Sequence, residues 1–143
     1  MLFRSLGYIM VKKVWVNGSF DILHIGHIRL LEYASLFGEV RVGVDTDERI
    51  KEKKGTDRPY NTLGDRVEFL YSIKYVTDVV TFGSNEELIE SIRTYGPDLM
   101  VIGDDYNYHT IIGIEYIPQV KFFPKIEGKS TTKILNYGKT NSL

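Results

Sequence analysis

The chain turns from strand to helix in the stretch Gly18-Ser19-Phe20-Asp21-Ile22-Leu23-His24-Ile25-Gly26-His27. An apolar run at residues 14–16 precedes this stretch, and a segment with helical periodicity follows it. His24 and His27 are three residues apart, so both imidazoles fall on one side of a helical turn. A helix start also offers unpaired backbone N–H groups and the positive end of the helix dipole. Together these features predict a cradle for a polyphosphate.

The glycines and histidines of this stretch also have simpler interpretations. Gly18 and Gly26 remove side chains where a phosphate approaches the backbone, or they are ordinary turn and helix-entry glycines. The imidazoles either donate hydrogen bonds to phosphate oxygens or are buried and satisfied by carbonyls. Asp21 could complete a metal site with them, although His109 is the only other histidine and cysteine is absent. Phosphate binding is favoured, and an imidazolium would add charge stabilisation there.

Composition and length favour one globular domain without a surface for nucleic acid or membranes. The chain has 143 residues, of which 43% are hydrophobic and 26% charged, and its formal net charge is -1. This balance leaves no basic field to attract nucleic acid or an anionic membrane. The absence of cysteine excludes disulfides, thiol catalysis and cysteine-based zinc sites. The chain contains no run of about 18 apolar residues, so no transmembrane helix is predicted.

Both ends of the chain are predicted to lie outside the domain. Residues 1–10 are interpreted as an extension, because polar residues and glycine interrupt their apolar character and no small-residue cleavage site follows. Met10 directly precedes the first convincing strand and is an alternative start. The domain is expected at residues 11–137, with a tail at 138–143. Since no signal peptide is found, the protein is expected to be cytoplasmic.

Strands and helices alternate along the chain. Apolar runs and alternating patterns predict strands at residues 13–16, 39–44, 78–82, 98–102 and 120–123. Helical periodicity predicts helices at residues 25–37, 63–74, 84–95 and 130–135, with a short helix and a mobile loop within 45–58. This alternation predicts an α/β fold, with a parallel sheet covered by helices on both faces. Ligands of such sheets bind beyond the carboxyl ends of the strands, where the strand order switches.

Polar segments directly follow three of the predicted strands, at residues 17–27, 103–106 and 128–133. They are therefore expected to converge at the carboxyl edge of the sheet. Asp104 could accept a hydrogen bond from a base or ribose, bind hydrated Mg²⁺, or merely cap a helix. Ser130, Thr131 and Thr132 offer hydroxyl groups and helix amides to a phosphate, unless Ser130 acts only as a helix cap.

A run of basic residues at 49–58 has two interpretations. Charge runs are usually solvated surface, but this one could form a flexible loop that closes over a triphosphate. Lys54, which precedes a glycine, is the residue expected to reach the phosphates. Arg66, one turn into the next helix, is either a second anion contact or part of a surface ion pair with Asp65 or Glu68.

Two signatures in this chain resemble those of the cytidylyltransferase-like nucleotidyltransferases. The first is the histidine stretch, and the second, weaker one is Gly128-Lys129-Ser130-Thr131-Thr132-Lys133-Ile134. The likeness runs from about residue 13 to residue 135. It implies a single Rossmann-like domain, a three-layer sandwich with a mostly parallel sheet. It also implies that a nucleoside triphosphate reacts with a phosphorylated small molecule in the presence of Mg²⁺, that pyrophosphate leaves, and that the protein is a homodimer.

The resemblance further implies roles for individual residues. The histidines would hold the triphosphate, Lys54 would cover it, and the hydroxyl groups of the second signature would bind its β- and γ-phosphates. The residues implied in catalysis are His24, His27, Lys54 and Ser130. The residues implied in nucleotide binding are Gly18, Ser19, Phe20, Gly26, Arg66, Asp104, Thr131 and Thr132. The acceptor phosphate is itself a nucleophilic anion, so positioning and charge neutralisation suffice for in-line displacement.

Two subfamilies compete for the substrates. Gly55-Thr56-Asp57-Arg58-Pro59-Tyr60-Asn61 resembles the adenylyltransferases that act on heptose 1-phosphate. The segment at residues 103–105 instead resembles glycerol-3-phosphate cytidylyltransferases, which usually have an arginine near the position of Lys125. Lys125 would replace the charge but not the bidentate fork of that arginine. ATP and a sugar phosphate are therefore favoured over CTP and glycerol 3-phosphate.

Three other classes of protein remain as alternatives. Class I aminoacyl-tRNA synthetases share the His-Ile-Gly-His motif, but they need a much larger catalytic domain and tRNA-binding parts. A module that binds a nucleotide without turnover would keep the phosphate cradle. An interaction module would suit the 10 tyrosines, although tyrosines are also ordinary core and rim residues.

Overall fold

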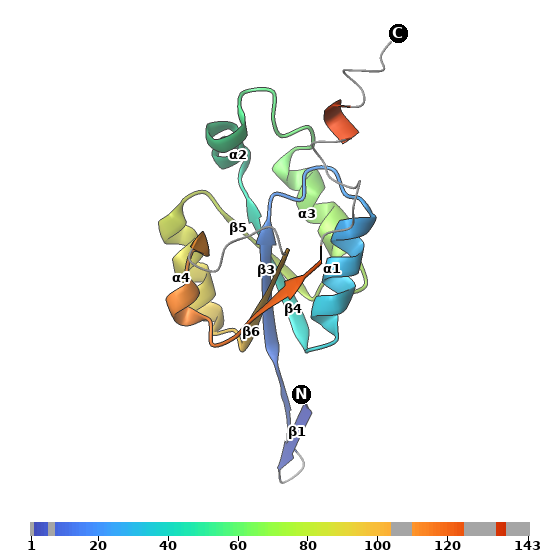
Figure 1. Ribbon diagram of the computed structural model, residues 1–143, viewed down its shortest axis with the longest axis vertical. Coiled ribbons are helices and arrows are strands. Elements are labelled where there is room, and N and C mark those ends of the chain that lie inside the picture. Colours follow the sequence, from blue (N-terminus) through green and yellow to red (C-terminus); the bar gives the residue numbers. More distant parts are fainter. Residues whose placement is uncertain (1, 6–7, 104–109, 125–133, 137–143) are drawn as a thin grey trace.

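A five-stranded parallel sheet forms the centre of the protein (Figure 1). The computed structural model describes residues 2–5, 8–103, 110–124 and 134–136. The strands of the sheet are β3 (Lys13–Gly18), β4 (Glu39–Asp45), β5 (Asp78–Phe82), β6 (Leu99–Gly103) and β7 (Val120–Phe123). All neighbouring strands pair in parallel, in the order β5-β4-β3-β6-β7. The predicted α/β fold with a parallel sheet is confirmed.

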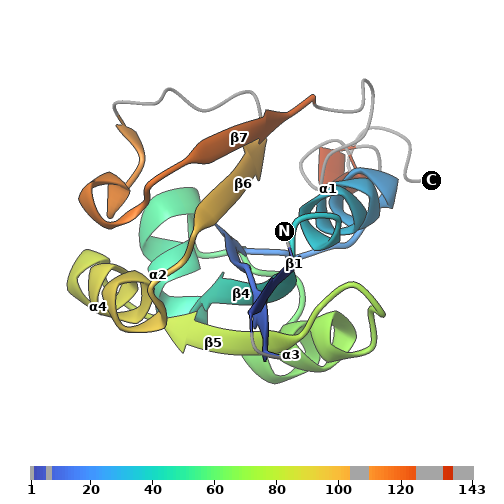
Figure 2. The ribbon, with the colours of Figure 1, turned by 90° about the horizontal axis from the view of Figure 1, so that it is seen from below.

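Helices cover both faces of the sheet. They are α1 (Ile25–Ser35), α2 (Asp47–Lys54), α3 (Leu63–Tyr71), α4 (Asn85–Tyr95) and the short 3-10 helix η2 (Ile114–Tyr116). Figure 2 shows α1 and α3 on one side of the sheet and α4 on the other. Strand β3 illustrates the alternation, since Val14 and Val16 belong to the core under α1 while Trp15 packs with the residues of α4. The predicted three layers are present.

The strand order places a switch point in the middle of the sheet. The chain runs outward from β3 to β4 and β5, and then returns to the other side of β3 with β6 and β7. In open parallel sheets, ligands bind at the carboxyl ends of the strands next to such a switch point. The histidine stretch leaves β3 at this point. The loop after β6, residues 104–109, lies outside the described residues.

Two predicted helices end earlier than their patterns indicated. Helix α1 ends at Ser35 rather than at residue 37, and α3 ends at Tyr71 rather than at residue 74. In both cases the apolar residues beyond the helix still pack on the core, as Phe37 and Ile73 do from turns. Gly38 then admits the entry to β4, because a Cβ there would clash with the carbonyl of Lys12. The periodicity marked buried positions correctly but not their backbone conformation.

The basic run and the amino-terminal residues are more ordered than the sequence indicated. Residues 47–54 are helical, with Thr46 as N-cap, so Lys54 ends a helix rather than lying in a mobile loop. Strands β1 (Leu2–Ser5) and β2 (Tyr8–Val11) pair as an antiparallel hairpin at the amino end of β3 (Figure 1). No helix in the described part of the chain is both long and apolar enough to cross a membrane.

Candidate active site

The two histidines form a reciprocal cap at the start of α1. His24 is the N-cap residue, and its Nδ1 accepts the N–H of Gly26 at 3.0 Å. The N–H of His24 in turn donates to Nδ1 of His27 at 3.1 Å. This is a capping box in which imidazoles replace the usual hydroxyl and carboxylate groups. The spacing of the motif is thus explained by local hydrogen bonds that begin the helix.

This cap determines which nitrogens the imidazoles present to a ligand. Because Nδ1 accepts a backbone N–H in each ring, the ring proton of each lies on Nε2. The ring centroids are 4.0 Å apart with 37° between the planes, so the rings lie side by side as the spacing predicted. Phe20 packs against His27 at 5.3 Å between centroids and supports the pair from the preceding turn. Two N–H donors are therefore arranged next to the positive end of α1.

His27 is neutral in the ligand-free protein. Burial lowers the pKa of His27 to about 4, and electrostatic interactions with His24 and Lys54 lower it further. Without a bound anion, His27 is therefore not an imidazolium near pH 7, and an imidazolium beside phosphate oxygens stays a prediction. A neutral imidazole still donates through Nε2–H, and it does so without the cost of a buried charge.

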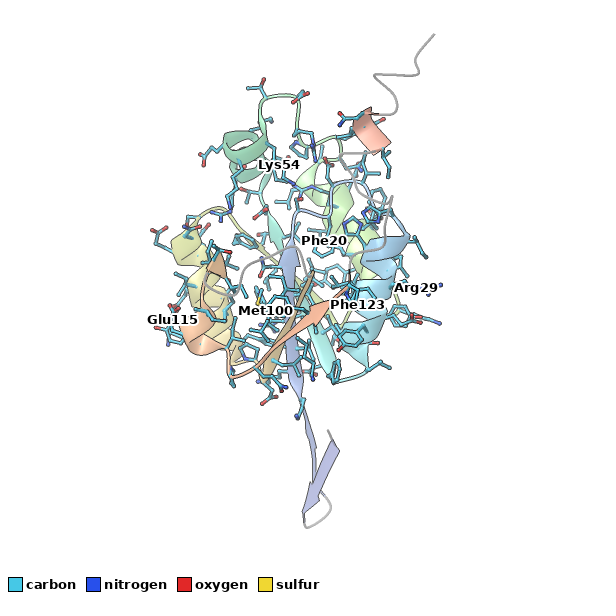
Figure 3. All side chains as sticks on the ribbon, in the orientation of Figure 1. Phe20, Arg29, Lys54, Met100, Glu115 and Phe123 are labelled. Carbon is cyan, nitrogen blue, oxygen red and sulfur yellow. The ribbon has the colours of Figure 1, made fainter. Side chains whose placement is uncertain are left out.

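Lys54 connects α2 to the turn after β3. Its Nζ donates to Oγ of Ser19 at 3.2 Å, and Figure 3 shows Lys54 at the same end of the sheet as Phe20. The residue as a whole is exposed, yet burial around its ammonium lowers the pKa of Lys54 below its usual value, and the charge of Arg58 lowers it further. Lys54 thus lies beside the turn after β3, at the end of a helix rather than in a loop, and its contact with the phosphates stays a prediction.

Arg66 clamps the loops beneath the site. The residue is fully buried, and its guanidinium donates to the carbonyls of Ser19 and Asp45, each at 2.8 Å. It also donates to the carbonyl of Asn61 at 3.1 Å and to the carboxylate of Asp47 at 2.6 Å. The surface ion pair with Asp65 or Glu68 is therefore wrong, because the acidic partner is Asp47. Since its donors bind protein acceptors, Arg66 acts here by holding three loops together.

A cavity of about 150 Å³ opens beside this clamp, between the strand ends and helices α2 and α4. Of the predicted site residues, Gly18, Ser19 and Lys54 line it, while the histidines lie outside its lining. Asp45 and Arg49 add charge to the wall. The apolar part of its lining consists of Phe82, Leu88, Met100, Ile102, Ile111 and Ile112. Lys54 therefore stands between the histidine turn and the cavity.

Arg49 and Asp45 are functional candidates that the sequence analysis missed. Nε of Arg49 donates to Asp45 at 3.1 Å, and a terminal nitrogen donates to Oδ1 of Asn85 at 2.7 Å. The guanidinium also lies over the ring of Phe82, 5.3 Å from its centroid. An acid at a strand end, followed four residues later by an arginine in the next helix, was the available signal. It was hidden within a run of exposed lysines.

A match to a protein-family model establishes the family of this chain. The model of the cytidylyltransferase-like family matches residues 15–134, which include every strand of the sheet except the first residues of β3. The chain belongs to this family. The resemblance drawn from the two signatures is confirmed, and the domain is of the nucleotidyltransferase class.

Bacterial relatives of this cytidylyltransferase-like domain share about two fifths of its residues. The bifunctional protein HldE of Campylobacter fetus is 41% identical over 124 residues, which cover 86% of this chain and 27% of the relative. The bifunctional protein HldE of Helicobacter hepaticus is 42% identical over 125 residues, which cover 87% of this chain and 26% of the relative. The chain thus spans about a quarter of the length of these relatives.

Solved structures share the fold. A lipopolysaccharide core biosynthesis protein from Thermoplasma volcanium superposes with a TM-score of 0.69 at 23% identity, covering 82% of this chain and 100% of that chain. A protein of unknown function from Archaeoglobus fulgidus gives a TM-score of 0.57 at 18% identity, covering 85% of this chain and 96% of that chain. At these identities the likeness establishes the architecture alone.

Four predicted site residues of the cytidylyltransferase-like domain lie outside the described residues, namely Asp104, Ser130, Thr131 and Thr132. Their meeting with the histidines stays a prediction. The helical segment at residues 134–136, which begins at the last residue of the second signature, lies towards the carboxyl end of the sheet in Figure 1. In the described part of the chain, no group of three or more metal-ligating side chains could hold a metal ion, so the metal site with Asp21 finds no support there.

Proposed function

We propose that this protein transfers a nucleotidyl group, preferably from ATP, to a sugar phosphate such as heptose 1-phosphate and releases pyrophosphate. The observation that carries the proposal is the histidine cap. It aligns two imidazole N–H donors at a helix start and has a lysine beside it. Family membership supports the reaction class, and the segment at residues 55–61 supports the choice of a heptose phosphate.

Direct in-line displacement suits these side chains. The acceptor phosphate attacks the α-phosphorus, the new P–O bond forms on one side, and the bond to pyrophosphate breaks on the other. The nucleophile is already an anion, so no strong general base is needed. His24 and His27 would donate hydrogen bonds to phosphate oxygens whose negative charge increases in the transition state. Lys54 would neutralise charge between the two substrates.

We assign the cavity beside Lys54 to the sugar part of the acceptor. Its wall combines an acceptor at Asp45 and donors at Arg49 with an apolar floor that includes Phe82. Such a mixture suits a polyhydroxylated molecule, whose hydroxyl groups bind polar atoms while its C–H faces pack on apolar side chains. This assignment leaves the histidine side of Lys54 for the triphosphate.

Mg²⁺ is proposed as the cofactor of this reaction. When bound, the ion would neutralise charge on the triphosphate and the leaving pyrophosphate. Mg²⁺ typically needs only one or two protein carboxylates when substrate phosphates supply further ligands. We assign the ion to the phosphate oxygens and to no described side chain.

The remaining roles concern residues outside the described part and the assembly. We propose that Ser130, Thr131 and Thr132 bind the β- and γ-phosphates and that Asp104 lies near the base or ribose. Gly18, Ser19, Phe20 and Gly26 would let the nucleotide approach the backbone. The protein is also proposed to act in the cytoplasm, and, on the resemblance stated above, as a homodimer.

A matrix of substrates tests the proposed function. ATP and CTP would each be combined with heptose 1-phosphate and with glycerol 3-phosphate in the presence of Mg²⁺, and pyrophosphate release would be measured. We expect the fastest release with ATP and heptose 1-phosphate. Release with CTP and glycerol 3-phosphate alone would favour the cytidylyltransferase alternative. Tight nucleotide binding without release from any pair would favour a non-catalytic binding module.

A further inference from the structure

Asp21 holds the segment that leads into α3. Its side chain is 1% exposed, and its carboxylate accepts the backbone N–H groups of Tyr60 and Asn61, each at 2.9 Å. The side-chain amide of Asn61 returns a hydrogen bond to the carbonyl of Asp21 at 2.6 Å. The turn that carries the histidines and the segment before α3 are therefore tied together around one buried carboxylate.

Arg58 is the charged partner of this carboxylate. Its Nε lies 3.3 Å from Oδ2 of Asp21, and its side chain is 12% exposed. Within the described residues, the hydrogen bonds of the guanidinium use Nε and leave the two terminal nitrogens without a protein acceptor. This contrasts with Arg66, whose nitrogens donate to three carbonyls and a carboxylate. Arg58 thus keeps the pair of donors that binds a phosphate in bidentate fashion.

Two positive charges, those of Arg58 and Lys54, repel each other in this part of the site. Arg58 and Lys54 are close enough for the charge of Arg58 to lower the pKa of Lys54, and Lys54 in turn lowers that of His27. The carboxylate of Asp21 accepts two backbone N–H groups, pairs with Arg58 and also interacts with the charge of Lys54. The carboxylate of Asp45 is paired with Arg49. A bound anion would relieve this repulsion, which is the arrangement expected at a phosphate site.

We propose that Arg58 is a further phosphate-binding residue of this site, and that Asp21 positions it by fixing Nε so that the terminal nitrogens face the ligand. The inference rests on the proposed function for the identity of the substrates, but not for the presence of a phosphate site. The phosphate belongs either to the nucleotide, as part of its triphosphate, or to the acceptor. If the ion pair between Arg58 and Asp21 were purely structural, it would need only the charge of Arg58 and its Nε contact, and the terminal nitrogens would have no role.

Calorimetric binding to the protein tests the proposal without requiring turnover. Three probes would be titrated, namely inorganic pyrophosphate, Mg-ATP and heptose 1-phosphate, against wild type, Arg58→Gln and Arg58→Lys. Lys51→Gln is the matched control, because Lys51 is exposed on α2 and belongs to the same basic run. Removing a charged donor pair should weaken binding about tenfold to a hundredfold. Lysine should restore part of this loss, since it keeps the charge but not the fork.

The pattern of losses identifies the source of the phosphate. Weaker binding of pyrophosphate and ATP by Arg58→Gln assigns the residue to the triphosphate, and weaker binding of heptose 1-phosphate alone assigns it to the acceptor. Unchanged binding of every probe that the wild type binds overturns the proposal. An equal loss in Lys51→Gln also overturns it, because the effect would then be a general loss of charge. If the wild type binds these probes but releases no pyrophosphate, the proposed function fails while the phosphate site stands.

A double-mutant cycle tests the positioning by Asp21. Asp21→Asn removes the negative charge with little change in shape, and all affinities would be measured well below the melting temperature of each variant. If Asp21 acts through Arg58, Asp21→Asn weakens phosphate binding in the wild type but has little further effect in Arg58→Gln. Equal losses in both backgrounds would overturn the positioning role, whatever the change in melting temperature.

Discussion

The histidine turn at residues 24–27 and the loop at residues 55–62 both reach the carboxyl end of the sheet, but different contacts hold them there. In the turn, each hydrogen bond of the cap joins residues two or three positions apart. In the loop, Tyr60 and Asn61 bind Asp21 across about forty positions. Arg66, just beyond the loop, reaches Ser19 across 47 positions and Asp45 across 21.

The geometry of the turn therefore depends on local contacts, whereas the geometry of the loop depends on the whole fold. The histidine cap is made by the start of one helix and can keep its geometry wherever that helix begins. The loop has its shape only when β3, β4 and α3 are assembled around Asp21 and Arg66. Substitutions in the turn should therefore change chemistry more than stability, and substitutions in the clamp should do the reverse.

The largest expected effect comes from breaking the long-range region with Arg66→Ala. This change leaves the carboxylate of Asp47 and the buried carbonyls around it without their donor. Removing one partner of a buried ionic network typically costs about 3–5 kcal/mol, or roughly 10 °C in melting temperature for a domain of this size. Thermal unfolding followed by circular dichroism would measure it. Arg93→Ala is the control, since the Arg93–Glu90 pair is exposed, and equal melting temperatures for the two variants would contradict the clamp.

Breaking the local region with His27→Ala should act on turnover instead. Loss of a donor aimed at charge that develops in the transition state lowers kcat about a hundredfold to a thousandfold. The fold should persist, because α1 remains anchored by Leu31 and Ala34 in the core. Pyrophosphate release and near-ultraviolet circular dichroism would be compared with those of Arg29→Ala, on the exposed face of the same helix. Near-normal turnover of His27→Ala would remove the imidazole from the mechanism.

The pH dependence of stability sharpens the comparison. The folded pKa of His27, about 4, lies below the value of 6.5 in an unfolded chain, so the unfolded state binds the proton more tightly. Stability should therefore rise with pH between about 4 and 6.5 and be lost on acidification through this window. The contribution is about 3 kcal/mol. His27→Asn should flatten this part of the curve in denaturant titrations, and a curve parallel to that of the wild type would be evidence against the buried neutral state.

The smallest expected effect is that of Gly26→Ala. A Cβ at this position would lie 2.7 Å from Cε1 of His24, so the imidazole must move, whereas alanine otherwise favours a helix. We expect turnover to fall about tenfold, or roughly 1.4 kcal/mol in the barrier, with the melting temperature nearly unchanged. Gly64→Ala in α3 is the matched control, because a Cβ there meets no atom within 4 Å. Equal turnover in the two variants would mean that the position of the His24 ring is not critical.

Sequence patterns predicted the parts of this protein that depend on neighbours in the chain. All five strands of the central sheet were predicted, and those at residues 78–82 and 120–123 have the predicted bounds. The paired imidazoles followed from their spacing. The patterns failed for Phe37 and Ile73, because burial continues beyond the helix end. They also failed for Lys54, since a run of charges does not distinguish a solvated helix from a loop.

Partners that are distant in the chain were not predictable in the same way. The acidic partner of Arg66 is Asp47, 19 positions earlier, while the acids expected to pair with it were its neighbours on α3. Asp21 was considered only as a metal ligand, because nothing in its own surroundings indicates the amides of Tyr60 and Asn61. The cavity and its Asp45–Arg49 pair likewise required β4, α2 and α4 to be placed in space.

The sequence by itself determined the alternation of strands and helices and the cap of α1, because helix geometry sets which residues two to four positions apart can hydrogen-bond. Only the tertiary structure decided which charges are buried together. Strand order brings the ends of β3 and β4 next to the start of α3, and a buried charge must find its partners there, since it can no longer be solvated by water. The roles of Arg66 and Asp21 therefore depend on the tertiary structure, whereas the geometry of His24 and His27 follows from the local sequence.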